Sequence, residues 1–543
     1  MLRISSTAAR RTRAAHDELW CSAQRCRRFI SISQLDPSIR DFTAALARKQ
    51  PAFSISPNSI RILSKPPQFY DLLLDMIRRA ERRIFISSLY IGSAESELIS
   101  ELRRALHEKS SLHLYLHLDL NRSTRPGASS TAKILLPLLK EYPTRVHVSM
   151  FRSPSLRGLL AKLVPPRFNE GWGTWHAKVY GVDDEIMISG ANLNKSYFTN
   201  RQDRYLHFTD QHGLAQYCFN FLRIVAQFSF KLLPAEGSSI IQPHSYVQED
   251  YVLQWLDPHT HPHRINQKAE NAFTAFQSSH LQPSTLDSSS PPSTRDSNHA
   301  IIFPIIQAGQ FNIREEETTF TLLFRHLNII ATAVRTRPLL DLTSGYFSLY
   351  KPYQDLILGS PYVDCKIVAA APKANGFFGS NGISGRIPEG YTLYEQRFMK
   401  AVKKAGRLWK DATGGGGQGV QLSEWSKKGW TYHAKGIWLS PSPLSPPVLT
   451  LFGSTNLNSR SAHLDTELSF LMVIPSEPPA VSQRIDSSNL ASDEDADSSA
   501  MSLRRGFAEE TERIRCDAVP WEGGRRNVRF TTKLIVWLVK GML

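Results

Sequence analysis

The chain has 543 residues, of which 41% are hydrophobic and 21% charged, and it carries a formal net charge of +16. This length exceeds one ordinary hydrophobic core and predicts two domains or two fused halves, while the charge favours anionic partners such as nucleic acid, anionic lipid or phosphate-bearing substrates. No run of 18 or more apolar residues occurs, so a membrane-spanning helix is not expected and any membrane contact would be peripheral.

The first 35 residues have the composition of a mitochondrial transit peptide. They are rich in Arg, Ser and Ala, contain no acidic residue before Asp17, and lack the apolar core of a secretory signal. The stretch "RRFISIS" around Arg28 resembles a presequence cleavage region. We therefore expect residues 1–35 to direct import into mitochondria, with a disordered basic arm as the alternative.

Short apolar runs alternate with helical patterns along the rest of the chain, which predicts an α/β fold. One half spans residues 50–256 and a second spans 301–474, joined by a Ser-, Pro- and His-rich tract at 257–300 that is typical of a linker. A second low-complexity tract covers 475–503, and residues 504–543 are expected to form a helical tail. The same apolar runs follow in the same order in both halves, which indicates a duplicated domain.

Each half contains the pattern Thr, aromatic, His, Ala, Lys. His176 and Lys178 lie in "GTWHAKVYGVD", and His433 and Lys435 lie in "GWTYHAKGIWL". Residues i and i+2 of a strand project from the same face, so each His is expected to point with its Lys. A pseudo-dimer of the halves would then bring two imidazoles and two ammonium groups to one cleft.

An asparagine and an acid follow each motif at equal separation. Asn192 precedes Asp203 by eleven residues, and Asn456 precedes Glu467 by eleven. The segment between His and Asn is sixteen residues long in the first half and twenty-three in the second, because the second contains the Pro-rich insertion "SPSPLSPP". The amides are candidates to hold phosphate oxygens. Each acid is a candidate to accept from an imidazole N–H and so fix its tautomer.

This set of groups suits phosphodiester chemistry. The ammonium groups would bind non-bridging oxygens, one neutral imidazole would attack phosphorus, and the other, protonated, would supply a proton to the leaving group. No metal is expected, because Lys is not a usual zinc ligand and no Cys or second His stands at ligand spacing. The five scattered cysteines suggest a reducing compartment without disulfides. The Gly-rich stretch 413–419 is expected to be a flexible loop rather than a phosphate cradle.

The motif "HAKVYGVD" resembles the His-x-Lys-x4-Asp signature of the phospholipase D superfamily, with His176, Lys178 and Asp183 in the motif positions. The second copy has Ser440 where the Asp would stand. Other segments make the chain similar to the eukaryotic mitochondrial phosphatidylglycerophosphate synthases: "SSLYIG", "DLNRSTR", "TSGYFSLY", "APKANGFFGSNGISGRIPEGYT" and "GWTYHAKGIWL". The resemblance covers roughly residues 50–475 and the C-terminal tail.

This resemblance implies two phospholipase D-like αβ(α) sandwich halves that form a pseudo-dimer with one active site between them. It implies transfer of the phosphatidyl group from CDP-diacylglycerol to sn-glycerol 3-phosphate, giving phosphatidylglycerophosphate and CMP without a cofactor, in phosphatidylglycerol and cardiolipin biosynthesis. His176 would be the nucleophile, His433 the acid and then the base, and Asp183 largely structural. The site would lie on the matrix side of the inner mitochondrial membrane, in peripheral contact with anionic lipid and with no nucleic-acid partner.

Two other functions fit the same motifs. One is a phospholipase D-type phosphodiesterase that hydrolyses phospholipid or nucleic acid. The other is a non-enzymatic anionic-lipid-binding protein with a vestigial site, although both histidines and both lysines are present. Two stretches are candidates for membrane contact, "FNFLRIVAQFSFKLL" and "FTTKLIVWLVKGML", since both are apolar with interspersed basic residues. Each is at least as consistent with a core-facing helix.

Overall fold

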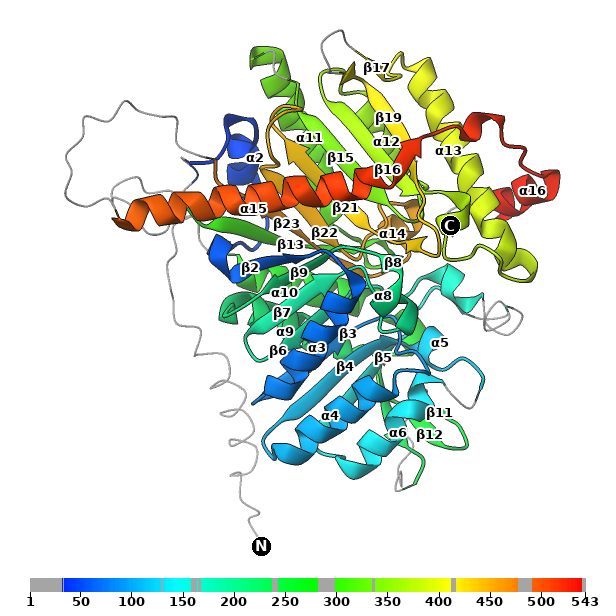
Figure 1. The fold of residues 1–543 in the computed structure, drawn as a ribbon. Helices are drawn as coiled ribbons and strands as arrows, with labels where there is room; N and C mark the ends of the chain where they lie inside the picture. The colour runs from blue at the N-terminus through cyan, green and yellow to red at the C-terminus, as the bar shows by residue number, and fades with distance from the viewer. Residues whose placement is uncertain are drawn as a thin grey trace, which may run out of the picture.

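Two large β-sheets organise the chain into two lobes, one above the other in Figure 1. The computed structural model describes residues 32, 34–127, 130–157, 164, 168–236, 243–281, 298–334, 337–411, 417–476 and 491–539, and for residues 334 and 491–498 the backbone alone. The predicted α/β fold class is confirmed, because helices cover sheets that contain both parallel and antiparallel strands.

The first lobe is built on a ten-stranded sheet. Its strand order is β11 (Tyr246–Val247), β12 (Tyr251–Trp255), β10 (Phe230–Pro234), β5 (Val146–Phe151), β4 (His113–Asp119), β3 (Arg83–Ser87), β6 (Val179–Val182), β7 (Glu185–Ser189), β9 (Tyr205–Phe208) and β2 (Ile60–Leu63). Its helices are α3 (Pro66–Arg79), α4 (Ser96–Glu108), α5 (Leu120–Ser123), α6 (Thr131–Glu141), α8 (Lys195–Thr199), α9 (His212–Ala226) and α10 (Asn266–His280).

The second lobe is built on another ten-stranded sheet. Its strand order is β1 (Phe53–Ile55), β13 (Ala300–Ala308), β23 (Glu467–Val473), β22 (Leu449–Gly453), β21 (Lys435–Ser440), β15 (Leu339–Ser344), β16 (Asp364–Ala370), β19 (Val420–Trp425) and β24 (Ala518–Pro520), with β14 (Ile313–Arg314) beside β13. Its helices are α2 (Pro37–Ala47), α11 (Glu315–Val334), α12 (Lys351–Leu358), α13 (Ile387–Lys404), α14 (Ser459–His463), α15 (Ala491–Cys516) and α16 (Phe530–Leu538). Two small ribbons complete the set: β17 (Lys410–Asp411) with β18 (Gly417–Gln418), and β8 (Arg201–Gln202) with β20 (Thr431–Tyr432).

The centres of the two sheets have the same topology. The run β5-β4-β3-β6-β7-β9 in the first lobe corresponds strand for strand to β19-β16-β15-β21-β22-β23 in the second. In each run the first three strands are parallel, and the strand that follows the His-x-Lys motif joins them antiparallel. The repeated apolar runs of the sequence thus form the same sheet twice.

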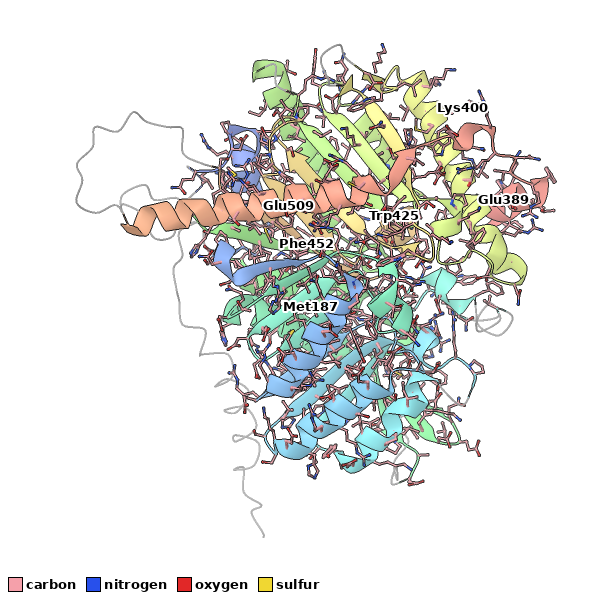
Figure 2. All side chains as sticks on the ribbon, in the orientation of Figure 1. Met187, Glu389, Lys400, Trp425, Phe452 and Glu509 are labelled. Carbon is pink, nitrogen blue, oxygen red and sulfur yellow. The ribbon has the colours of Figure 1, made fainter. Side chains whose placement is uncertain are left out.

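The two lobes share part of one hydrophobic core. A large buried cluster contains residues of the first lobe together with residues from β21, β22 and β23 of the second. The rings of Phe208 and Phe452 stack at this boundary with centroids 6.1 Å apart. Figure 2 shows Phe452 at the junction, between Met187 of the first lobe and Glu509 on α15. Burial of apolar side chains across the boundary makes the lobes one packed body.

Helix α15 runs alongside the boundary between the lobes in Figure 1, and its side chains contact both of them. Glu510 receives hydrogen bonds from Arg204 of the first lobe at 2.9 Å and from Trp438 of the second, also at 2.9 Å. Arg204 further donates to the carbonyl of Leu451 at 2.8 Å. Buried charges are costly unless each is paired and hydrogen-bonded. Because Arg204 and Glu510 can pair only when both lobes are in place, these contacts define how the lobes dock.

Three predicted domain boundaries need correction. Residues 257–300 contain α10, whose Phe273 and Phe276 are buried, so the linker prediction is wrong for residues 266–280. Strand β1 lies in 50–256 but pairs with β13 of the second sheet. The tract 475–503 includes the start of α15, and the tail 504–543 contributes β24 to the second sheet. The predicted transit peptide lies outside the described residues apart from its last few, of which Leu35 is buried in the second lobe.

Candidate active site

The two histidines reach the site through backbone pairing between the lobes. The His176 N–H donates to the carbonyl of Thr466 at 2.9 Å, and the His433 N–H donates to the carbonyl of Gln202 at 2.8 Å. Each His therefore lies beside the segment that leads to the acid of the opposite half. His176 and Lys178 precede β6, and Lys435 is the first residue of β21.

Each imidazole is paired with the carboxylate of the other half. Nδ1 of His176 lies 2.8 Å from Oε2 of Glu467, and Nδ1 of His433 lies 2.6 Å from Oδ2 of Asp203. All four side chains are buried. With Nδ1 engaged by a carboxylate, Nε2 is the nitrogen of each ring that can act on a substrate. In His433 this nitrogen also lies 3.2 Å from Nζ of Lys435.

The two acids are held by different neighbours. Glu467 accepts from the hydroxyl of Ser461 at 2.6 Å and from that of Ser454. Asp203 accepts from the backbone N–H of Arg204 at 2.8 Å. Gly190 stands where the second half has Ser454, and a Cβ there would lie 2.7 Å from Oδ1 of Asp203. A glycine is therefore required at this position.

Both lysines are fully buried beside the histidines. Nζ of Lys178 donates to the carbonyl of His176 at 2.8 Å, and Nζ of Lys435 donates to the carbonyl of His433 at 2.6 Å. Burial and then the charge of Lys435 lower the pKa of Lys178 to about 7, despite the opposing effect of Glu467. Burial lowers the pKa of Lys435 to about 8, against the attraction of Asp203 and Glu467. Each ammonium is poised to neutralise an anionic ligand.

Burial also sets the state of the histidines and their acids. It lowers the pKa of His433 well below its usual value, and the charges of Lys435 and Arg201 lower it further. Burial lowers the pKa of His176 too, although Glu467 partly offsets this. Burial raises the pKa of Asp203 to about 6 in spite of Lys435. Both rings are therefore neutral in the free site at neutral pH.

Both site asparagines are buried, and Asn192 is linked to His433 through a tyrosine. Nδ2 of Asn192 donates to the hydroxyl of Tyr197 at 3.0 Å, and this hydroxyl lies 3.4 Å from Nε2 of His433. Within the described part of the chain, the buried Oδ1 atoms of Asn192 and Asn456 have no hydrogen-bond partner. Buried polar atoms are normally satisfied, so these amides are free to contact a ligand.

Asp183 does not join this cluster. It lies in the turn between β6 and β7 with φ of 51°, and its carboxylate accepts from the backbone N–H groups of Glu81, Arg82 and Arg83 at 2.8–2.9 Å. It thus holds the start of β3, at the opposite end of the strands from His176, because a strand advances about 3.3 Å per residue. These contacts agree with the largely structural role that the resemblance implies for Asp183.

Beside His176, Asp465 and Glu467 place potential ligand atoms within 4.8 Å of one another and of the ring. Asp465, however, already accepts from the N–H and hydroxyl of Thr174 at 2.8 and 2.9 Å and pairs with Arg460 at 3.0 Å. The guanidinium occupies the position of a cation. The donor set is that of a positioned carboxylate pair rather than of a metal centre.

Five residues of the site were not singled out from the sequence. They are Ser454, Ser461, Tyr197, Arg201 and Tyr346. The ring of Tyr346 meets that of His433 edge-on at 5.5 Å. An alignment of the two halves would have drawn attention to Arg201, because the equivalent position of the second half is the acidic residue Asp465.

Two duplicated lobes, each with a His and a Lys and each supplying the acid for the other, define a two-lobed phosphoryl-transfer enzyme of the phospholipase D type. Among solved structures, the chain is similar in fold to phosphatidylserine synthase of Haemophilus influenzae Rd KW20, with a TM-score of 0.61, 18% identity and coverage of 94% of this chain and 100% of that one. At this identity the match bears on the fold alone. No protein-family model matches the chain.

Similarity to curated proteins is stronger. The chain is 34% identical over 455 residues to the CDP-diacylglycerol–glycerol-3-phosphate 3-phosphatidyltransferase of Schizosaccharomyces pombe, covering 79% of this chain and 87% of that protein. It is 36% identical over 464 residues to the mitochondrial form of Homo sapiens, covering 80% and 77%. The chain therefore belongs to the family of CDP-diacylglycerol–glycerol-3-phosphate 3-phosphatidyltransferases, which confirms the resemblance in the sequence. The mitochondrial name of the human relative supports a mitochondrial location.

Replacing Glu467 with Gln tests the crossed pairing. The amide keeps the size of the side chain but loses the charge that holds the N–H of His176. We expect kcat to fall by about 10²- to 10⁴-fold, as when the acid of a His-based catalytic unit is neutralised. The measurement is steady-state turnover, with the unfolding midpoint as a check on folding. Glu509→Gln, on the exposed side of α15, is the control; wild-type turnover by the Glu467 variant would contradict the assignment.

The pKa values of the buried groups predict a bell-shaped pH profile. Activity should rise through about pH 6 as Asp203 ionises and fall between about pH 7 and 8 as Lys178 and Lys435 lose protons. The profile of kcat/KM reports the free enzyme and that of kcat the complex. Bound phosphates favour the ammonium forms, so the alkaline limb of kcat should lie at higher pH. A flat profile between pH 5 and 9 would contradict these roles.

Proposed function

We propose that the chain transfers the phosphatidyl group of CDP-diacylglycerol to sn-glycerol 3-phosphate, forming phosphatidylglycerophosphate and CMP for phosphatidylglycerol and cardiolipin synthesis. The observation that carries the proposal is the pair of crossed His–carboxylate contacts flanked by two buried lysines. The names of the relatives supply the donor and the acceptor. The reaction is a phosphodiester exchange, and the site holds the groups that such an exchange uses.

In the first step Nε2 of His176 attacks the phosphorus that bears the diacylglycerol. A P–N bond forms and the P–O bond to CMP breaks, while the Nε2 proton of protonated His433 passes to the leaving oxygen. His433 is neutral in the free site, and the negative charge of the bound diphosphate raises its pKa so that it can carry this proton. Glu467 steadies the positive charge that develops on His176.

In the second step the hydroxyl of glycerol 3-phosphate attacks the phosphohistidine. The neutral ring of His433 takes the hydroxyl proton, a new P–O bond forms, and the P–N bond to His176 breaks. Lys178 and Lys435 stabilise the charge on the non-bridging oxygens in both steps, which is electrostatic stabilisation by fixed groups. The residue that acts as acid in the first step thus acts as base in the second.

Acceptor dependence separates transfer from hydrolysis. With CDP-diacylglycerol alone we expect each enzyme molecule to release at most one CMP, and continued release to need glycerol 3-phosphate. Quench-flow assay of CMP with and without the acceptor makes the measurement. His176→Ala and His433→Ala should each abolish turnover, and the double variant should lose no more than either single one. Continued CMP release in water at the same rate would instead support the phosphodiesterase.

A lipid donor requires contact with a bilayer, and we place this contact at α16. The other candidate stretch forms α9 and β10, and Tyr217, Phe221 and Val225 of α9 are buried, as in a core helix. Among the described residues, no helix is long and apolar enough to cross a membrane. Contact at α16 would therefore be peripheral, on the matrix side of the inner membrane.

The exposed face of α16 suits an anionic bilayer. Phe530, Leu534, Trp537 and Leu538 are 79%, 46%, 68% and 65% exposed and recur at helical spacing, while Val536 packs inward. Arg525, in the segment that leads into this helix, and Lys533, in the helix itself, add exposed positive charge. An apolar stripe flanked by basic residues binds at the interface of anionic membranes.

Trp537→Glu should reduce binding to vesicles that contain cardiolipin by at least about tenfold. The substitution removes the aromatic ring that would be buried in the bilayer and adds a charge that anionic lipid repels. Flotation of the protein with such vesicles measures this effect. Leu444→Glu is the matched control, since Leu444 is 98% exposed in the loop between β21 and β22. Equal binding by both variants and the wild type would contradict the assignment to α16.

A further inference from the structure

Two equivalent positions of the halves carry opposite charges. Arg201 and Asp465 each lie nine residues after the site asparagine of their half. Each contacts the threonine that stands two residues before the histidine of the other half. Nε of Arg201 donates to Oγ1 of Thr431 at 3.0 Å, and Oγ1 of Thr174 donates to Asp465 at 2.9 Å. The backbone framework is thus the same on both sides of the site, and the charge is reversed.

The charge of Asp465 is neutralised by an ion pair, and that of Arg201 is not neutralised by any described carboxylate. Asp465 forms an ion pair with Arg460 at 3.0 Å. Arg201 forms no ion pair with any carboxylate in the described ranges of the chain; its guanidinium lies over the ring of Tyr197, 4.3 Å from the centroid. It is only partly exposed. A sheltered cation without an anionic partner is costly, so this arrangement suits a site that receives an anion from outside.

Arg201 lies on the side of the site that belongs to His433. Tyr197, which carries the guanidinium on its ring, meets the His433 ring edge-on at 5.0 Å. After burial and Lys435, the charge of Arg201 is the next cause of the lowered pKa of His433. An anion on Arg201 is therefore adjacent to the ring that handles the proton of the acceptor.

The loop at residues 375–381 borders the same place. A Cβ on Gly376 would lie 3.1 Å from the hydroxyl of Tyr346 and 3.2 Å from Nη2 of Arg201. The ring of Phe377 packs on that of Tyr346 with centroids 5.9 Å apart. Gly376 belongs to the "ANGFFGS" stretch that distinguishes this sequence from a general phospholipase D pattern. A side chain on residue 376 would therefore crowd both the phenol and the guanidinium.

We propose that Arg201 binds the phosphomonoester of the acceptor and selects a phosphorylated glycerol over an unphosphorylated alcohol, with the Gly376 loop closing this pocket. The inference rests on the proposed function and names the residue that would decide its acceptor. Guanidinium pairs with phosphate through two parallel hydrogen bonds, and its planar fork stacks on an aromatic ring, as it does here on Tyr197. With its phosphate bound to the guanidinium of Arg201, the acceptor would present its hydroxyl to His433.

Arg201→Gln is the direct test. We expect KM for glycerol 3-phosphate to rise roughly tenfold to hundredfold, the effect of one lost charge-assisted contact. The preference for glycerol 3-phosphate over glycerol, as a ratio of kcat/KM values, should fall by a similar factor. KM for CDP-diacylglycerol should stay close to wild type. Arg201→Lys keeps the charge without the fork and should give an intermediate KM.

Gly376→Ala tests the pocket without touching the charge. The methyl group would force the guanidinium or the phenol to shift by a few tenths of an ångström, and we expect a raised KM for the acceptor alone. Arg152→Gln is the matched control, because its guanidinium also lies over a tyrosine ring, that of Tyr246 at 5.4 Å, near the sheet edge formed by β11. This variant should leave both KM values unchanged.

Three results would overturn the inference. One is an unchanged KM for glycerol 3-phosphate in the Arg201→Gln and Gly376→Ala variants. Another is a rise of KM for CDP-diacylglycerol instead, which would assign the guanidinium to the diphosphate of the donor. The third is an unchanged preference over glycerol. Failure of the proposed function looks different, since the wild-type protein itself would then release CMP without any need for glycerol 3-phosphate.

Discussion

Exchange of carboxylates between the lobes is the constraint on which the site depends. His176 takes its acid from the second lobe, as Glu467, and His433 takes its acid from the first, as Asp203. Neither lobe alone contains a complete His–acid unit. The shared core, the buried contacts of α15 and the backbone pairing beside each His all serve to keep the lobes in one register, because a small slip would break both hydrogen bonds at once.

The sequence was sufficient to find the groups that carry the chemistry. His176, Lys178, His433 and Lys435 stand out because the pattern occurs twice, and the acids follow because their spacing from the asparagines is the same in both halves. The alternation of apolar runs was likewise enough for the α/β class, and their recurrence in the same chain order was enough for the duplication of the domain. Features that occur in both halves can be predicted from the sequence, since both copies must satisfy the same local geometry.

Features that arise only when distant segments meet were not readable. The spacing is compatible with each acid serving its own half or the other, and only the docked lobes decide. Asp183 is close to His176 in sequence but lies at the far end of the strands, so motif membership did not mean a shared site. Helix α10 has the Ser, Asn and Gln of a linker, and its two phenylalanines became informative only once Phe273 and Phe276 were seen to be buried.

Differences between the two halves allow the two histidines to have different roles. Two identical halves would present the same surroundings to both histidines, and a two-step transfer needs one ring to hold the phosphorus and the other to move the proton. The charge reversal between Arg201 and Asp465 supplies that difference. The loop that bears Gly376 beside Arg201 runs on past the exposed Phe378 and Ile383 into α13, whose Glu389 holds Arg529 at the start of α16. One continuous segment thus connects the surroundings of Arg201 to the exposed apolar face of α16. A lipid donor held at α16 and a water-soluble acceptor held at Arg201 would therefore approach the two histidines from adjoining directions.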